Sequence, residues 1–104
     1  MNQQNLVTLT TDFGLRDGYV AAMKGVIVDV LSTATVVDAV HEVPPGDIQH
    51  AGYVLSTYWS LYPKGTIHVV VVDPGVGSSR KGLVIEGGGF FFVGPDNGVF
   101  EPVY

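Results

Sequence analysis

The sequence predicts an α/β protein with three layers, in which a mainly parallel sheet carries helices on both faces. Two observations lead to this fold class. Stretches with strand periodicity and stretches with helix periodicity alternate along the chain, and the stretch "TIHVVVV" is apolar on both faces. Inner strands of parallel sheets read as such apolar runs, and strand–helix–strand order implies right-handed crossovers that place helices on the sheet.

The first half of the chain predicts strand, helix and strand. Residues 6–10, "LVTLT", are apolar or β-branched and are expected to form a short strand that ends at "TDFG". Asp17 is expected to cap a following helix. Its apolar face comprises Val20, Met23, Ile27 and either Val30 or Leu31. Residues 35–40, "TVVDAV", predict the second strand.

The second half predicts another helix and three strands. Asp47, after the loop sequence "PPG", is expected to cap the helix, and Pro63 with Gly65 to end it. One face of this helix is lined by Ile48, Ala51, Leu55, Tyr58 or Trp59, and Tyr62. Residues 66–72, "TIHVVVV", form the third strand, and "GLVIEGGGFFFVG" predicts two short strands joined by a glycine-rich turn.

Composition narrows the class of function. With 104 residues the chain is at most one domain, and a net charge of −5 argues against binding to nucleic acid or an anionic membrane. The sequence has no cysteine, no signal-peptide pattern at its start and no apolar run that could span a bilayer, so we expect a cytoplasmic protein. Its 46% hydrophobic and 14% charged residues suggest contacts with other subunits or segments.

Two aspartates and a histidine follow the expected strands at one edge of the sheet. The first strand ends at Asp12, the second at His41 and the third at Asp73. Ligands of open parallel sheets bind at this carboxyl edge. Asp12 alone could be a turn aspartate that bonds its own backbone, or a carboxylate that accepts hydrogen bonds from a ribose hydroxyl pair.

The loop "DPGVGSSR" that follows the third strand pairs an aspartate with an arginine. It lacks the Gly-Lys-Ser/Thr ending of a phosphate-binding loop, and Asp73 would repel phosphate. Arg80 within reach would keep the Asp73 carboxylate ionised and oriented. The alternative is a tight turn with a solvated arginine.

The remaining motifs give weaker indications of function. "DFG" also occurs in protein kinases, but a kinase needs a far longer chain. Asp96 and Asn97 in "GPDNG" predict a turn, and Asn-Gly suits a hairpin. The three histidines lack the spacing of zinc ligands, so no metal site is expected, and His68 in its apolar strand is expected in the core or at an interface.

Four stretches together resemble one family over nearly the whole chain: "TLTTDFGLRDGYVAAMKGVI", "DAVHEVPPGDIQHAGYVL", "PKGTIHVVVVDPGVGSSRKGLVI" and "FVGPDNGVF". The family is the S-adenosyl-L-methionine (SAM) hydroxide adenosyltransferases, or SAM hydrolases, relatives of the fluorinating and chlorinating SAM enzymes. The resemblance implies that residues 1–104 form a partial N-terminal α/β domain without the family's C-terminal β domain. It also implies cleavage of SAM, as substrate and without a further cofactor, to adenosine and L-methionine by attack of water or hydroxide on ribose C5′.

The resemblance also assigns roles to residues. Asp12 would hold the ribose hydroxyls, Phe13 and Asp73 would also contact the substrate, and Asp17 would lie near its methionine end. Asp73 and Arg80 would belong to an Asp-Arg-His set that positions and activates the water. The histidine of that set would lie beyond Tyr104. Family members resemble one another in forming homotrimers, with the site between one subunit's N-terminal domain and its neighbour's C-terminal domain.

Two other functions stay open. A SAM-dependent halogenase would share the fold, but halogenating relatives carry an aromatic residue where Asp73 stands, and fluorinating ones carry an insertion near "EGGGF". Both differences favour hydroxide as the nucleophile. The chain could also be a non-catalytic fragment that binds adenosine or SAM weakly or serves only in assembly.

Overall fold

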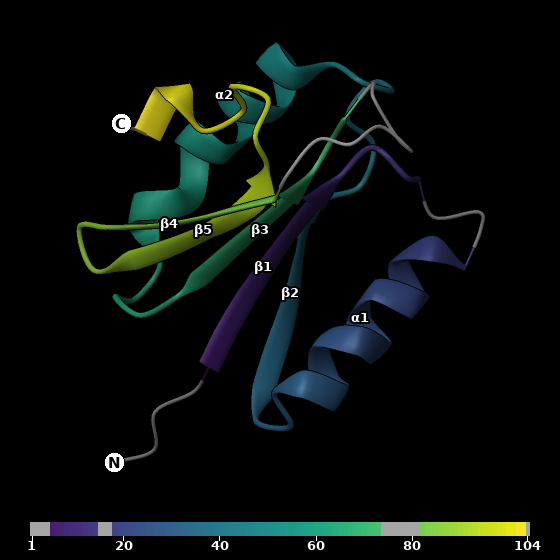
Figure 1. The fold of residues 1–104 in the computed structure, drawn as a ribbon, viewed down its shortest axis with the longest axis vertical. Helices are drawn as coiled ribbons and strands as arrows, with labels where there is room; N and C mark the ends of the chain where they lie inside the picture. The colour runs from purple at the N-terminus through teal and green to yellow at the C-terminus, as the bar shows by residue number, and fades with distance from the viewer. Residues whose placement is uncertain (1–4, 15–17, 74–81, 104) are drawn as a thin grey trace.

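The computed structural model describes residues 5–14, 18–73 and 82–103 and confirms the α/β fold. Five strands form one sheet in the order β2-β1-β3-β5-β4, in which β4 alone runs antiparallel to its neighbour (Figure 1). The elements are β1 (Asn5–Thr11), α1 (Tyr19–Val30), β2 (Ala34–Val40), α2 (Ile48–Tyr58), η1 (Trp59–Leu61), β3 (Ile67–Val71), β4 (Gly82–Gly87), β5 (Phe90–Pro95) and η2 (Glu101–Val103).

The strand order reverses between β1 and β3. From β1 the chain passes through α1 to β2 on one side of β1, and then returns through α2 to β3 on the other side. Two right-handed crossovers in opposite directions place their helices on opposite faces. The side chains agree, because Val69 borders a cleft with α1 whereas its neighbour Val70 belongs to the core packed on α2.

The main core lies between the sheet and α2. Buried apolar side chains from α2, β3 and β5 and from the loops before α2, after β3 and after β5 meet there: Val43, Ala51, Leu55, Val70, Val72, Phe90, Phe92, Val99 and Phe100. On the opposite face β3 is only half-buried, at Ile67, Val69 and Val71. The expected inner strand is therefore confirmed between β1 and β5, although its two faces differ in burial.

His68 is a core residue, fully buried among aromatic rings. Its Nε2 lies 3.0 Å from the Trp59 carbonyl oxygen, and its Nδ1 lies 2.7 Å from the Thr8 hydroxyl. Because a carbonyl can only accept, Nε2 carries the hydrogen and Nδ1 accepts from Thr8. Four aromatic rings surround the imidazole, with centroids 5.5 to 5.7 Å from its own: Tyr58, Tyr62, Phe90 and Phe92.

The helix ends follow the sequence closely. Asp47 caps α2 as predicted, since its Oδ1 accepts a hydrogen bond from the His50 amide at 3.0 Å. Gly18 occupies the cap position of α1, and the predicted cap Asp17 lies outside the described residues. Leu31 rather than Val30 ends the inward face of α1, because Val30 is 81% exposed.

The glycine-rich turn joins β4 and β5 as predicted. Gly88 and Gly89 both have positive φ, 62° and 89°, which side chains other than glycine rarely adopt. The two strands pair from Gly82 with Pro95 to Gly87 with Phe90. This hairpin forms the edge of the sheet farthest from β2.

Gly94→Ala should destabilise the fold because β5 approaches its neighbours closely at this position. A Cβ on Gly94 would lie 2.5 Å from the Val70 carbonyl oxygen and 2.8 Å from Phe100 Cζ. We expect a loss of about 1–3 kcal/mol in the free energy of unfolding. Urea denaturation, followed by the fluorescence of the single tryptophan, measures it.

Gly25→Ala is the matched control for Gly94→Ala. Gly25 lies inside α1, and apart from the neighbouring residues and the backbone of its own helix nothing lies within 4 Å of the position that an alanine methyl group would take. Alanine should therefore stabilise the helix by about 0.5–1 kcal/mol. Changes of the same sign in both variants would contradict the close packing of β5 on β3.

The stability of the protein should depend on pH through His68. Burial lowers the pKa of His68 below its ordinary value of 6.5. Between the lowered pKa and 6.5 the unfolded chain binds more protons, so stability is fully present above 6.5 and is lost as the pH falls through that window. The measurement is the free energy of unfolding between about pH 5 and 7.5 in wild type, His68→Gln and His50→Gln.

The glutamine variants separate the contribution of His68 from that of other groups. His68→Gln should show a smaller fall in stability toward low pH than wild type. His50→Gln, which changes an exposed histidine on α2, should keep the wild-type fall. An unchanged pH dependence in His68→Gln would show that the buried imidazole does not control it.

Candidate functional site

Three residues that the sequence places at the carboxyl edge of the parallel strands, two of them predicted site residues, lie there in the structure. Asp12 directly follows β1, His41 directly follows β2, and Asp73 lies two residues after β3. The strand register places the three residues at similar heights along the strand direction, because Thr10 pairs with Val40 and Thr11 pairs with Val71. The gap between β1 and β3 is also where the strand order reverses, which is the place where open α/β sheets bind ligands.

Asp12 is held by a loop that is distant in sequence. Its Oδ2 accepts a hydrogen bond from the Gly46 amide at 2.7 Å, and the side chain is half-buried. Gly46 has a φ of 70°, which turns its N–H toward the carboxylate in a conformation that glycine adopts at little cost. The bond joins residues 34 positions apart, so Asp12 does more than close its own turn.

The backbone on both sides of Asp12 is pinned to the end of β2. The Gly14 amide donates to the His41 carbonyl oxygen at 2.7 Å, and the Val43 amide donates to the Thr11 carbonyl oxygen at 3.4 Å. Gly14 has a φ of 71°, so the "TDFG" segment turns back there. Asp12 therefore sits in a loop that two neighbouring segments hold in place.

His41 joins a chain of polar side chains that begins on α1. Lys24 Nζ lies 2.6 Å from Asp38 Oδ2, His41 Nε2 lies 2.7 Å from Asp38 Oδ1, and His41 Nδ1 lies 2.8 Å from Thr11 Oγ1. The hydrogen bonds from Lys24 and then from His41 hold the pKa of the Asp38 carboxyl below its ordinary value. The sequence placed His41 at this edge without indicating a role for it. The hydrogen bonds that link Lys24, Asp38 and Thr11 to His41 were not predicted.

Asp73 is half-buried, and a neighbouring side chain fixes the backbone just before it. Asn97 Nδ2 donates to the Val72 carbonyl oxygen at 2.8 Å, and Asn97 Oδ1 accepts from the Val99 amide at 3.1 Å. The "GPDNG" segment makes the predicted turn, with Gly98 at a φ of 89°. It does not make the hairpin that Asn-Gly suits, because the chain continues into η2 so that Val99 and Phe100 can enter the core.

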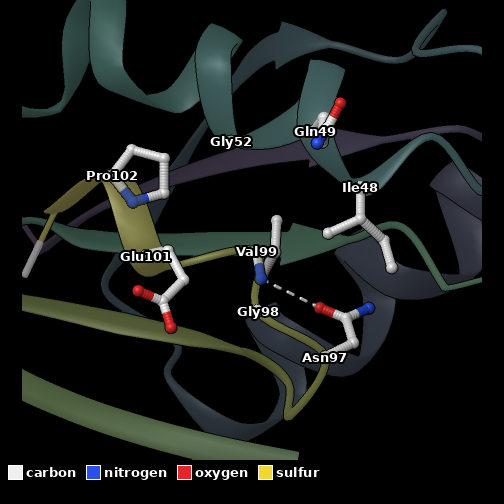
Figure 2. A pocket seen from close by; sticks show the side chains of 8 residues that line it. All are labelled: Ile48, Gln49, Gly52, Asn97, Gly98, Val99, Glu101 and Pro102. Carbon is white, nitrogen blue, oxygen red and sulfur yellow. Dashed lines mark hydrogen bonds between the residues drawn. The ribbon is translucent and has the colours of Figure 1, made fainter.

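A cleft of about 450 Å³ lies beside Asn97, between the start of α2 and η2. Figure 2 shows Glu101 and Pro102 of η2 on one side of it, with Ile48 and Gln49 of α2 on the other. Gly52 of α2 allows the close approach, since a Cβ there would lie 3.0 Å from the Val99 carbonyl oxygen. This cleft is on the α2 side of the sheet edge.

A second cleft, of about 350 Å³, lies on the α1 side and is almost wholly apolar. It is lined by Phe13, Tyr19, Ala22, Met23, Val26, Ile27 and Val69. The Phe13 and Tyr19 ring centroids are 5.9 Å apart, so two aromatic rings flank this cleft next to the Asp12 backbone. Phe13 thus offers an apolar surface adjacent to the carboxylate that sequence analysis singled out.

Two predicted site residues, Asp17 and Arg80, lie outside the described residues, as does the loop that would bring Arg80 toward Asp73. Within residues 5–14, 18–73 and 82–103, no three histidine or acidic side chains gather in a way that could hold a metal ion. In the same residues no helix is long and apolar enough to cross a membrane.

Comparison with known proteins links this chain to one family. Residues 7–104 match the family described as "SAM hydroxide adenosyltransferase N-terminal domain". The (R)-S-adenosyl-L-methionine hydrolase of Methanocaldococcus jannaschii is 48% identical over 104 residues, and that of Thermus thermophilus is 43% identical over 94 residues. A fluorinase of Nocardia brasiliensis is more distant, at 25% over 80 residues.

Solved structures give the same result for the fold. A conserved hypothetical protein from Thermus thermophilus has a TM-score of 0.88 at 39% identity, covering 96% of this chain and 42% of its own. An uncharacterized conserved protein from Thermotoga maritima also has a TM-score of 0.88, at 40% identity over 93% of this chain and 38% of its own.

The matches cover most of this chain but a minor part of the curated relatives. The Methanocaldococcus jannaschii alignment takes in 95% of this chain and 39% of the hydrolase, and the Thermus thermophilus one 90% and 36%. The fluorinase alignment takes in 77% and 27%. The family match, the identities and the shared fold agree: the chain belongs to the SAM hydroxide adenosyltransferase family, and residues 7–104 correspond to its N-terminal domain.

Proposed function

We propose that this chain forms the nucleoside-binding part of an enzyme that hydrolyses SAM to adenosine and L-methionine. The observation that carries the proposal is the placement of Asp12 and Asp73 at the ends of two adjacent parallel strands where the strand order reverses. The curated relatives that are 43 to 48% identical are all named as SAM hydrolases, which supports this reaction for the chain.

The reaction asks the protein for alignment more than for acid catalysis. A water oxygen attacks C5′ of the ribose, the C5′–S bond breaks, and its electron pair stays on sulfur as the neutral thioether of methionine. The water loses a proton and becomes the 5′-hydroxyl of adenosine. Because the sulfonium is already a cationic leaving group, the site must chiefly align water, C5′ and sulfur and exclude bulk water.

The proposal assigns a role to each site residue. Asp12 accepts hydrogen bonds from the ribose hydroxyls, Phe13 lies against the substrate, and Asp17 lies near the methionine end. Asp73 contacts the substrate and, together with Arg80, orients and activates the water. The third member of that set, a histidine, belongs to sequence beyond Tyr104. SAM is the substrate, and the proposed mechanism uses no metal and no other cofactor.

The assembly is also proposed from the family. We propose a homotrimer in the cytoplasm, with each site completed by a neighbouring subunit. Support comes from large apolar side chains that this chain leaves exposed: Tyr19, Val26, Val28, Val30, Tyr53, Leu61 and Val84. Such exposure is typical of surfaces that contact another subunit or segment.

Hydrolysis by this mechanism places the oxygen of water on adenosine. Incubation of SAM in H₂¹⁸O with the full-length protein, including the histidine that this proposal places beyond Tyr104, should yield ¹⁸O in the 5′-hydroxyl of adenosine and none in L-methionine, as measured by mass spectrometry. Asp73→Ala should lower the rate by at least about 100-fold, because it removes a group that positions the water. Its circular dichroism should match wild type.

Three results would contradict parts of this proposal. Near-normal turnover in Asp73→Ala would remove Asp73 from the catalytic set. Formation of 5′-chloro-5′-deoxyadenosine, with turnover that rises with chloride, would favour the halogenase. Binding of adenosine without any product would favour the non-catalytic function.

The ribose contact of Asp12 can be tested with a matched pair of ligands. Wild type should bind adenosine about 10- to 100-fold more tightly than 2′,3′-dideoxyadenosine, because hydrogen bonds to a carboxylate contribute about 1.5–3 kcal/mol. Asp12→Ala should bind both weakly and with nearly equal Kd, as measured by calorimetry. Persistence of the preference in Asp12→Ala would mean that another group reads the ribose hydroxyls.

A further inference from the structure

We propose that His41 is a positioning residue for the Asp12 carboxylate, acting through Thr11 and the backbone of residues 11–14. The polar chain Lys24, Asp38, His41 and Thr11, here called the His41 relay, runs from α1 through the end of β2 to the end of β1. The inference rests on the proposed function, in which Asp12 binds ribose, and it assigns His41 no contact with the substrate.

The His41 relay has one consistent arrangement of hydrogen atoms around a neutral imidazole. Lys24 can only donate and an ionised Asp38 can only accept, so His41 Nε2 carries a hydrogen that it donates to Asp38. His41 Nδ1 then has a free lone pair and accepts from the Thr11 hydroxyl. The Thr11 oxygen is left to accept from the Phe13 amide at 3.2 Å.

In this arrangement His41 accepts hydrogen bonds from residues on both sides of Asp12. The imidazole bonds Thr11, the residue before Asp12, and the His41 carbonyl oxygen accepts from Gly14, two residues after it. His41 is also 5% exposed, so water competes little for these bonds. The Asp12 side chain therefore emerges from a backbone whose two ends are tied to a single residue.

The position of the Asp12 carboxylate must be precise if it is to bind a hydroxyl pair. A carboxylate that grips a hydroxyl pair needs both oxygens at hydrogen-bond distance, and one of them also bonds Gly46. If the binding group is loosely held, the protein binds the ligand more weakly, because part of the binding free energy is then used to order that group. The relay supplies that order before the ligand arrives.

The chain contains a natural control for this proposal on the same strand. Thr8 and Thr11 both lie on β1, both are fully buried, and each hydroxyl bonds the Nδ1 of a buried histidine, at 2.7 and 2.8 Å. The partner of Thr8 is His68, whose Nε2 bonds the Trp59 carbonyl in the core. Removing either hydroxyl breaks the same kind of bond, but only the Thr11 bond reaches the Asp12 loop.

The experiment compares Thr11→Val, Thr11→Ser and Thr8→Val in the 104-residue chain with adenosine as the probe. Thr11→Val should raise the adenosine Kd about tenfold, a change that corresponds to about 1.4 kcal/mol. Thr11→Ser keeps the hydroxyl and should restore the wild-type Kd. Thr8→Val should lower the stability of the fold and leave the adenosine Kd within about twofold of wild type.

Two further readouts do not depend on ligand binding. In ¹⁵N NMR spectra the His41 side chain should carry its hydrogen on Nε2 alone. Amide hydrogen exchange at Phe13 and Gly14 should be faster in Thr11→Val than in wild type and unchanged in Thr8→Val. Asp38→Ala, which alters a side chain that is 44% exposed, should speed the same amides even if Thr11→Val fails to fold.

The outcomes separate this inference from the proposed function. If Asp12→Ala weakens adenosine binding but Thr11→Val leaves both the Kd and the exchange at Gly14 unchanged, His41 does not position Asp12. If Thr11→Val speeds the exchange while neither it nor Asp12→Ala alters the adenosine Kd, the relay orders the loop but the ribose role of Asp12 is wrong, and the positioning role falls with it. Equal effects of Thr8→Val and Thr11→Val on the adenosine Kd would reduce the relay to a contribution to stability.

Discussion

The parallel pairing of β1 with β3 is the constraint on which the candidate site depends. Residues Asp12 and Asp73 are distant in sequence, but Thr11 pairs with Val71, so the two carboxylates leave the sheet within about one residue's rise of each other. A shift of one residue in this register would also turn the core face of β3, with His68 and Val70, toward α1. The packing that buries these side chains therefore also sets the level of the two acidic groups.

The two faces of the sheet stabilise the site in different ways. On the α2 side the structure uses dense apolar packing, and its one buried imidazole there, His68, satisfies both ring nitrogens inside the core. On the α1 side β3 is only half-buried, and an ion pair of Lys24 with Asp38 adds a polar link between α1 and β2. An exposed ion pair contributes little to stability, so its value lies in orienting His41.

The sequence alone predicted what local rules determine. Periodicity identified the order of the helices and strands, Asp47 was recognisable as a cap, and the common edge of Asp12, His41 and Asp73 followed from parallel strands. Long-range partners were not predictable in this way, because nothing near Asp12 indicates Gly46 and nothing near His41 indicates Thr11. One clue was present, since "TVVDAVH" places an aspartate within β2 and a histidine three residues later, directly after the strand.

The charge of the proposed substrate explains why two carboxylates at one edge need different surroundings. A carboxylate next to the sulfonium would stabilise SAM more than the transition state, in which the positive charge on sulfur is fading, and would slow the reaction. Asp12 avoids this cost if its hydrogen bond from Gly46 keeps it directed at the ribose, whose hydroxyls change little during the attack. Asp73 can then act on the water, where positive charge develops as the new C–O bond forms. The fixed orientation of Asp12 is therefore a requirement of the proposed chemistry, and the bonds that tie residues 11–14 to His41 and Gly46 are the part of the fold that meets it.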